Sequence, residues 1–153
     1  FLTAPTGAGK SAFYQVSGIY LAQVHQAVTL VITPLIALMQ DQVSQLEARG
    51  VHCATFLNSN VSHEEREERL NAIHKGEKSI LYIAPEMLLT TSLETLLGGR
   101  RLGLFVVDEA HQLGPGFPCG LLVHGRLSGA PAQKWTALPG ALPDGNGCVW
   151  WQG

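Results

Sequence analysis

The chain has 153 residues, 46% of them hydrophobic, which is enough to bury the core of one ordinary domain. Its formal net charge of -2 excludes a strongly basic surface, so any contact with nucleic acid would depend on local charges or backbone amides. The three cysteines, Cys53, Cys119 and Cys148, form no CxxC pair, which argues against a zinc site or a disulfide framework and fits a reducing compartment.

The first residues of the chain already belong to a motif, and the first residue is Phe1 rather than Met. Residues 1–4 (FLTA) are predicted to be the remnant of a strand, and residues 10–25 a helix. We therefore expect the sequence to be a fragment that lacks its N-terminus. No apolar run is long enough to span a membrane, and we expect no signal peptide.

Short apolar strands alternate with helices up to residue 111. Strands are predicted at residues 28–33, 51–57, 79–84 and 102–108, and helices at residues 35–49, 63–75 and 86–97. Ser62 with Glu65 forms a capping box at the start of the second of these helices, and Gly76 ends it. The alternation indicates an α/β fold with right-handed crossovers and a mostly parallel sheet covered by helices on both faces. Ligands of such sheets bind at the carboxyl ends of the strands.

A phosphate-binding pattern, APTGAGKS, occupies residues 4–11 and departs from GxxxxGKS only where Ala4 replaces glycine. Its small residues let backbone amides surround an anion, and the following helix adds its positive N-terminal end. Lys10 is predicted to reach the β- and γ-phosphates of ATP, and Ser11 to ligate Mg²⁺. The other residues predicted to bind the nucleotide are Thr6, Gly7, Ala8 and Gly9. A glycine-rich turn that binds nothing is the alternative, which the order of strand, loop and helix disfavours.

Two adjacent acids follow the last predicted strand, in VVDEAH at residues 106–111. Asp108 is predicted to hold the magnesium through its water shell, and Glu109 to polarise the water that attacks the γ-phosphate. His111 is a candidate relay between ATP and another site. Alone, such acids are more often a solvated turn, but their pairing with Lys10 and Ser11 favours a catalytic role.

Three strands end in a similar way, in TAPTG (3–7), ITPLI (32–36) and IAPEM (83–87). Each places a proline in the first turn of a helix, where its missing N–H has no partner to lose. These turns alone need no ligand, yet all three lie on one sheet edge, where helix N-termini offer amides to phosphates. The residues predicted to contact nucleic acid there are Thr33, Pro34, Leu35, Gln40, Pro85 and Glu86.

The segments APTGAGKSAFYQ, LVITPLIALMQDQV, FLNS, ILYIAPEML and FVVDEAH resemble superfamily 2 helicases in order and spacing, and RecQ-type DNA helicases in particular. The resemblance covers residues 1–113, most of a first RecA-like motor domain. It implies motif I at residues 4–11, motif Ia around 33–43, motif Ib around 84–88 and motif II at 108–111. It also implies ATP-dependent 3′-to-5′ unwinding of DNA, with ATP and Mg²⁺ as cofactors and DNA as the partner.

The resemblance stops after residue 113. The family's aromatic-rich loop, motif III and second RecA-like domain with its arginine finger are absent from the sequence. Only three of the 22 Lys, Arg, Asp and Glu residues follow residue 111. When the codons possible for residues 113–118 are read in a frame shifted by one nucleotide, they can encode W-G-x-D-F-R, the motif that this loop commonly contains in the family. We therefore interpret residues 114–153 as an irregular tail outside the family, either out of frame or disordered; a genuine small β-rich or linker appendage is the alternative.

The sequence thus predicts the ATP-binding part of a RecQ-like helicase, inactive on its own without its second RecA-like domain. A non-catalytic nucleotide- or nucleic-acid-binding module from a disrupted gene is the alternative from another class. A DEAD-box-like RNA helicase is disfavoured by DEAH and by PLIALMQDQV. We expect a cytoplasmic, nucleoid-associated location if the source is bacterial and a nuclear one if it is eukaryotic.

Overall fold

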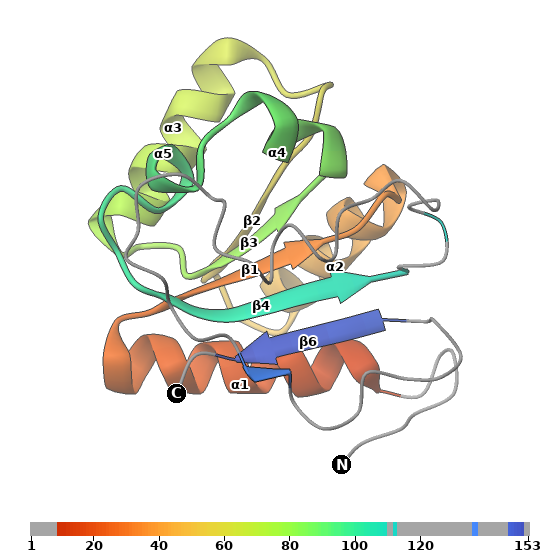
Figure 1. Cartoon of the computed structure of the whole chain (residues 1–153), viewed down its shortest axis with the longest axis vertical. Helices are drawn as coiled ribbons and strands as arrows, with labels where there is room; N and C mark the ends of the chain where they lie inside the picture. Colours follow the sequence, from red (N-terminus) through yellow and green to blue (C-terminus); the bar gives the residue numbers. More distant parts are fainter. Residues whose placement is uncertain (1–8, 110–111, 113–135, 138–146, 152–153) are drawn as a thin grey trace.

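The structure is a computed structural model that describes residues 9–109, 112, 136–137 and 147–151 (Figure 1). Its helices are α1 (Lys10–His25), α2 (Ile36–Ala48), α3 (His63–Lys75), α4 (Pro85–Thr90) and α5 (Leu93–Leu97). Its strands are β1 (Val28–Ile32), β2 (Ala54–Leu57), β3 (Ile80–Ile83), β4 (Leu102–Asp108), β5 (Thr136–Ala137) and β6 (Gly147–Trp151). None of the described helices has the length and apolar character that a membrane crossing requires.

The strands form one sheet in the order β2-β3-β1-β4-β6-β5. Pairs β2–β3, β3–β1 and β1–β4 are parallel, which confirms the predicted α/β class with a parallel sheet. Strand β6 pairs antiparallel with β4, and β5 pairs antiparallel with β6. These last two strands lie in the tail, to which the sequence pattern assigned no regular structure.

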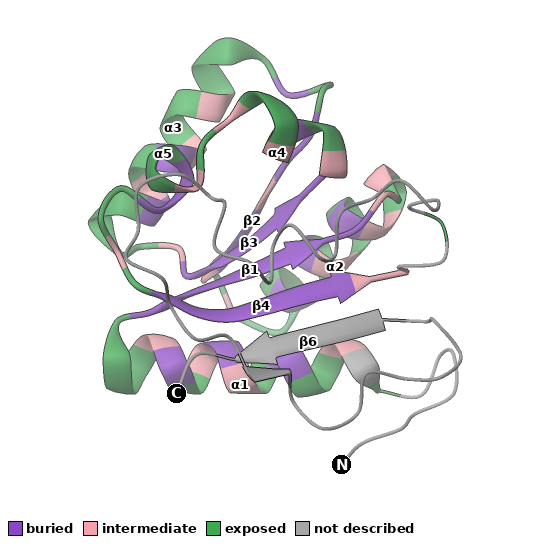
Figure 2. Cartoon of the chain, in the orientation of Figure 1, coloured by how far each residue is buried: buried purple, intermediate pink, exposed green. Residues whose placement is uncertain are grey.

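The parallel strands form the centre of the core, as Figure 2 shows by their colour. All residues of β1 and β3 are buried, as are the first six of β4. Their sequences are continuous runs of β-branched and other apolar residues, as expected for strands covered on both faces. Burying each such Val, Leu or Ile side chain stabilises the fold by about 1.5–3 kcal/mol relative to leaving it in water.

Helices cover both faces of the sheet. Right-handed crossovers require α2 on one face and α3 with α5 on the other. The side chain of Gln15 in α1 is hydrogen bonded to that of Gln42 in α2, so these two helices share a face. On the other face α3 and α5 lie side by side, joined by a 2.8 Å contact between His74 Nε2 and Thr95 O (Figure 1).

The helix predicted at residues 86–97 is wrong as a single element, because the structure has two helices there. Thr91 is extended (φ -126°, ψ 127°), and Ser92 begins α5 by accepting a hydrogen bond from the Thr95 amide. A serine hydroxyl competes with the backbone of a continuing helix and favours a new N-terminus instead. The other elements predicted within the described residues are present, and β2 starts at Ala54 rather than at residue 51. The strand predicted at residues 1–4 lies outside the described residues.

Candidate functional site

The carboxyl ends of the central strands bring several predicted residues to one edge of the sheet. Ile32 of β1 pairs with Ile83 of β3 and with Val107 of β4, so the residues that follow them are neighbours. The Thr33 amide donates to the Ile83 carbonyl at 3.2 Å. Figure 1 shows β1, β3 and β4 pointing toward this edge, where α2 and α4 begin. The turns at residues 32–36 and 83–87 therefore share the predicted edge, and the turn at residues 3–7 lies outside the described residues.

Gly9, the residue that precedes α1, adopts the left-handed conformation (φ 78°, ψ 9°). A Cβ on Gly9 would meet no described atom within 4 Å, and no side chain caps the helix. The first turn carries no acidic residue. Its amides are thus suited to an anionic group such as a phosphate, and the half-buried Ser11 lies in the same turn. Thr6, Gly7, Ala8 and the Lys10 side chain lie outside the described residues.

The predicted acids lie where β4 ends. Asp108 is its last residue and is half-buried. Glu109 has φ 53°, a left-handed conformation that costs a non-glycine residue about 1 kcal/mol, and its amide donates to Asp108 Oδ1 at 3.0 Å. Such strain held in place by the surrounding fold is typical of functional turns. His111 lies outside the described residues.

The residues predicted to contact nucleic acid differ in accessibility. Thr33 is buried, and its hydroxyl accepts from the Leu35 amide at 3.5 Å, so its side chain faces the fold. The side chains at the surface are Leu35, Gln40 and Glu86, whereas Pro34 and Pro85 are half-buried. Pro85 occupies the first turn of α4, as the sequence pattern predicted.

A buried polar cluster beside this edge was not among the predicted site residues. Gln15, 6% exposed, donates from Nε2 to Gln42 Oε1 at 2.8 Å and to Tyr82 Oη at 3.0 Å. We call these three residues the Gln15 bridge. The ring of Tyr14 packs edge-on against Tyr82, with centroids 6.3 Å apart. Tyr14 Oη is buried and has no hydrogen-bond partner among the described residues.

Electrostatics connect this cluster to the predicted metal ligands. Burial raises the pKa of Tyr14 far above its ordinary value, Tyr82 adds to this, and the nearby Ser11 hydroxyl acts in the opposite direction. Burial likewise raises the pKa of Tyr82, which the hydrogen bond from Gln15 partly offsets. The negative charge of Asp108 raises the pKa of both tyrosines. Tyr14 also lies three residues after Ser11 in α1, so the two side chains share one face of that helix.

Sequence periodicity could not find the Gln15 bridge, because its hydrogen bonds join residues 27 and 67 positions apart. The one local signal is a tyrosine followed by a glutamine on the inner face of a helix, where polar side chains are uncommon. Buried polar groups of this kind are almost always hydrogen bonded, which is why a partner had to exist.

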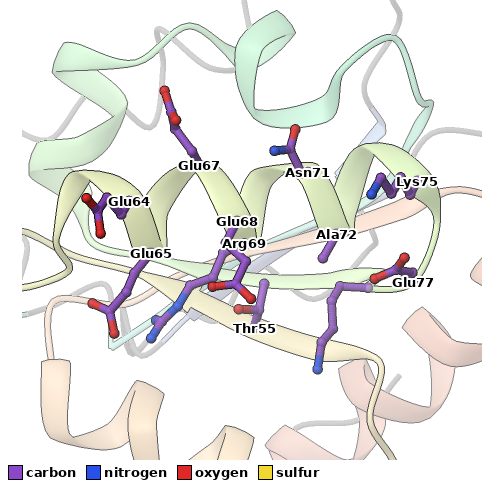
Figure 3. A pocket seen from close by; sticks show the side chains of 11 residues that line it. Thr55, Glu64, Glu65, Glu67, Glu68, Arg69, Asn71, Ala72, Lys75 and Glu77 are labelled. Carbon is purple, nitrogen blue, oxygen red and sulfur yellow. The ribbon is translucent and has the colours of Figure 1, made fainter.

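A pocket beside α3 is chemically unsuited to the predicted ligand. Figure 3 shows most of its side chains along α3, and five of its eleven lining residues are glutamates. None of the predicted site residues lines it, and its acids would repel phosphate groups. The pocket is lined by Thr55, Glu64, Glu65, Glu67, Glu68, Arg69, Asn71, Ala72, Lys75, Glu77 and Lys78. No cluster of three or more His, Cys, Asp or Glu residues with metal-site geometry occurs among the residues that the structure describes.

Comparisons with known proteins agree with these features. The model of the DEAD/DEAH box helicase family matches residues 1–126. The chain is 42% identical over 107 residues to the ATP-dependent DNA helicase RecQ of Bacillus subtilis (strain 168), which covers 70% of this chain and 17% of that protein. It is 40% identical over 150 residues to the ATP-dependent DNA helicase Q5 of Rattus norvegicus, covering 90% of this chain and 15% of that protein. The chain thus spans less than one fifth of either relative.

Proposed function

Because the chain belongs to the DEAD/DEAH box helicase family, and within it to the RecQ type, we propose that it is the ATP-binding part of an ATP-dependent 3′-to-5′ DNA helicase. The observation that carries the proposal is the packing of Tyr14, three residues after Ser11 in α1, against Tyr82 of β3, whose strand end is joined through β1 to the end of β4 at Asp108. The phosphate-loop helix and the acidic strand end therefore adjoin one another. This adjacency is the arrangement that phosphoryl transfer with a bound metal requires.

In this proposal the nucleotide phosphates bind at the start of α1. Lys10 compensates the charge of the β- and γ-phosphates, and the amides of residues 6–11 donate to their oxygens. Mg²⁺ would be held by Ser11 and, through water, by Asp108, and it would neutralise charge that develops on the phosphates. The uncapped N-terminus of α1 supports this assignment.

Glu109 is proposed to orient and deprotonate the attacking water, and His111 to relay the state of the nucleotide to the DNA site. The backbone of Glu109 supports a role for this turn, because it adopts the left-handed conformation. In this conformation the Glu109 amide donates a hydrogen bond to Asp108 Oδ1 and orients that carboxylate. Such strain persists only where the surrounding fold enforces it.

DNA is the proposed polymer, since the relatives' names specify DNA helicases. A single strand would be held by its phosphates at the starts of α2 and α4, near Thr33, Pro34, Leu35, Gln40, Pro85 and Glu86. The proposed location follows from the substrate: the nucleoid-containing cytoplasm in a bacterium and the nucleus in a eukaryote. An RNA substrate has no observation in its favour.

Binding of a fluorescent ATP analogue to the 153-residue chain in the presence of Mg²⁺ tests the proposal. Lys10→Ala is expected to weaken binding at least about tenfold, because one charge-assisted contact contributes about 1.5–3 kcal/mol. Lys75→Ala, which changes an exposed lysine on α3, is the matched control and should bind like the wild type. Equal binding by all three proteins would refute the nucleotide site.

Glu109→Gln separates binding from hydrolysis. In a full-length protein that contains the second RecA-like domain, the variant should retain ATP binding and lose hydrolysis by about 10²-fold or more. Parallel loss of both would contradict the role of Glu109 as a base. We expect the 153-residue chain alone to show no DNA-stimulated hydrolysis, and such hydrolysis would contradict that expectation.

The division of the chain is also a proposal. Residues 1–113 are assigned to the first RecA-like domain and residues 114–153 to a tail produced by reading in another frame, although the family model still matches up to residue 126. The nucleotide sequence around codon 113 tests this assignment. A codon other than GGA for Gly116 removes the aspartate of W-G-x-D-F-R from the alternate frame and contradicts it.

A further inference from the structure

The Gln15 bridge joins three elements of the fold through one side chain. Gln15 comes from α1, Gln42 from α2 and Tyr82 from β3. Both hydrogens of the Gln15 amide are used, one for each partner, so the side chain is fixed in a single orientation. Tyr82 is 1% exposed and Gln15 is 6% exposed, so water cannot replace these partners without rearrangement.

One end of the bridge borders the nucleotide site of the proposed function. Gln15 follows Tyr14, which lies three residues after Ser11 in α1 and whose hydroxyl is buried without a partner among the described residues. Tyr82 packs against the Tyr14 ring and is also within the influence of Asp108. A displacement of the first turns of α1, or of the end of β4, therefore reaches the bridge directly.

The other ends of the bridge lead to the segments proposed to hold a nucleic-acid strand. Gln42 lies on α2, whose first turn follows Pro34 and Leu35. Tyr82 is followed by Ile83 and Ala84 and then by α4. The bridge is therefore a polar link from the phosphate-loop helix to both strand-binding segments.

We propose that Gln15 is a positioning residue that transmits binding of Mg²⁺-nucleotide at α1 to the segments at the starts of α2 and α4. This inference rests on the proposed function. Occupation of the site orders α1 and the end of β4, and the two hydrogen bonds of Gln15 then restrict α2 and the β3–α4 turn. Gln15 touches neither nucleotide nor metal in this role, so it affects the response of the other segments rather than binding itself.

Hydrogen exchange measured by mass spectrometry on the 153-residue chain tests the inference, with and without a nonhydrolysable ATP analogue and Mg²⁺. In the wild type the analogue should slow exchange at least about twofold in α1, in α2 and in residues 82–90. Gln15→Met keeps the side-chain volume but removes both donors. It should keep the protection of α1 and lose that of α2 and residues 82–90.

Two further variants make the test specific. Gln45→Met changes an exposed glutamine of α2 that bonds only within its own helix, to Asp41 at 2.7 Å, and should respond like the wild type. Gln42→Met breaks one arm of the bridge at a half-buried residue, so it remains informative if Gln15→Met fails to fold. It should lose protection of α2 while residues 82–90 still respond.

The outcomes separate the two proposals. If the wild type does not bind the analogue, the proposed function fails, and this inference fails with it. If the wild type binds but its protection is confined to α1, only the inference is overturned. The same holds if Gln15→Met responds in α2 and residues 82–90 as the wild type does.

Discussion

The side chain of Arg100 donates hydrogen bonds to three backbone carbonyls. Its Nη1 donates to the carbonyls of Ile73 and Lys78, both at 2.8 Å, and its Nη2 donates to that of Gln26 at 3.1 Å. These carbonyls lie at or beyond the C-terminal ends of α3 and α1, where the last turns lack intrahelical partners. Partial burial lowers the pKa of Arg100, although the guanidinium stays charged at any ordinary pH.

We expect Arg100→Ala to lower the free energy of unfolding by about 2 kcal/mol, because three carbonyls lose a charged donor. Arg101→Ala is the matched control, since the neighbouring Arg101 side chain is exposed and makes no hydrogen bond or ion pair with the residues that the structure describes. It should change stability by less than about 0.5 kcal/mol. Urea denaturation followed by circular dichroism measures both. Similar stability of the two variants would show that the Arg100 contacts contribute little.

At the scale of single elements, the stability of α3 depends on the capping of its two ends more than on burial along its length. It is the most polar helix, with only Leu70 and Ile73 buried. Ser62 Oγ accepts from the Glu65 amide at 3.3 Å, and Glu65 Oε2 accepts from the Ser62 amide at 3.2 Å. Gly76 ends the helix at φ 85°. The capping box and the glycine stop predicted from the sequence are thus confirmed.

Ser62→Ala should destabilise the protein by about 1 kcal/mol, because it leaves an amide of the first turn without its acceptor. The loss should appear as faster hydrogen exchange at the start of α3. Ser44→Ala makes the same change at an exposed position inside α2 and should leave stability equal or slightly higher, since alanine favours helix interiors. Unchanged exchange at the start of α3 in Ser62→Ala would contradict a stabilising cap.

The elements show which signals a sequence carries. Strands such as β1 and β4 were predictable because continuous apolar runs bounded by turns have few other interpretations. The break between α4 and α5 was missed because the cap at Ser92 resembles an ordinary helical serine. The turns at residues 32–36 and 83–87, which follow β1 and β3, were predicted to share an edge, since the carboxyl ends of parallel strands meet there. The Gln15 bridge was not predictable, because it depends on how α1 and α2 pack.

At the scale of the whole molecule, the buried tyrosines Tyr14 and Tyr82 make the free energy of unfolding fall as the pH becomes alkaline. The folded state raises the pKa of Tyr14 and Tyr82, chiefly through burial. Below the unfolded value of about 10, both residues are neutral in both states and this stability is fully present. As pH rises above that value, the unfolded chain releases protons that the folded chain retains. The free energy of unfolding must therefore fall.

Each tyrosine that stays protonated in the folded state should contribute a slope of about -1.4 kcal/mol per pH unit above pH 10. Tyr14→Phe removes one such group and should make the decline of stability between about pH 10 and 12 shallower by this amount. Tyr20→Phe makes the same change at a residue that is 60% exposed and is the matched control. Urea denaturation across this pH range measures the slopes. Identical slopes for the wild type and Tyr14→Phe would mean that the Tyr14 hydroxyl is accessible to hydroxide, contrary to its burial at the proposed nucleotide site.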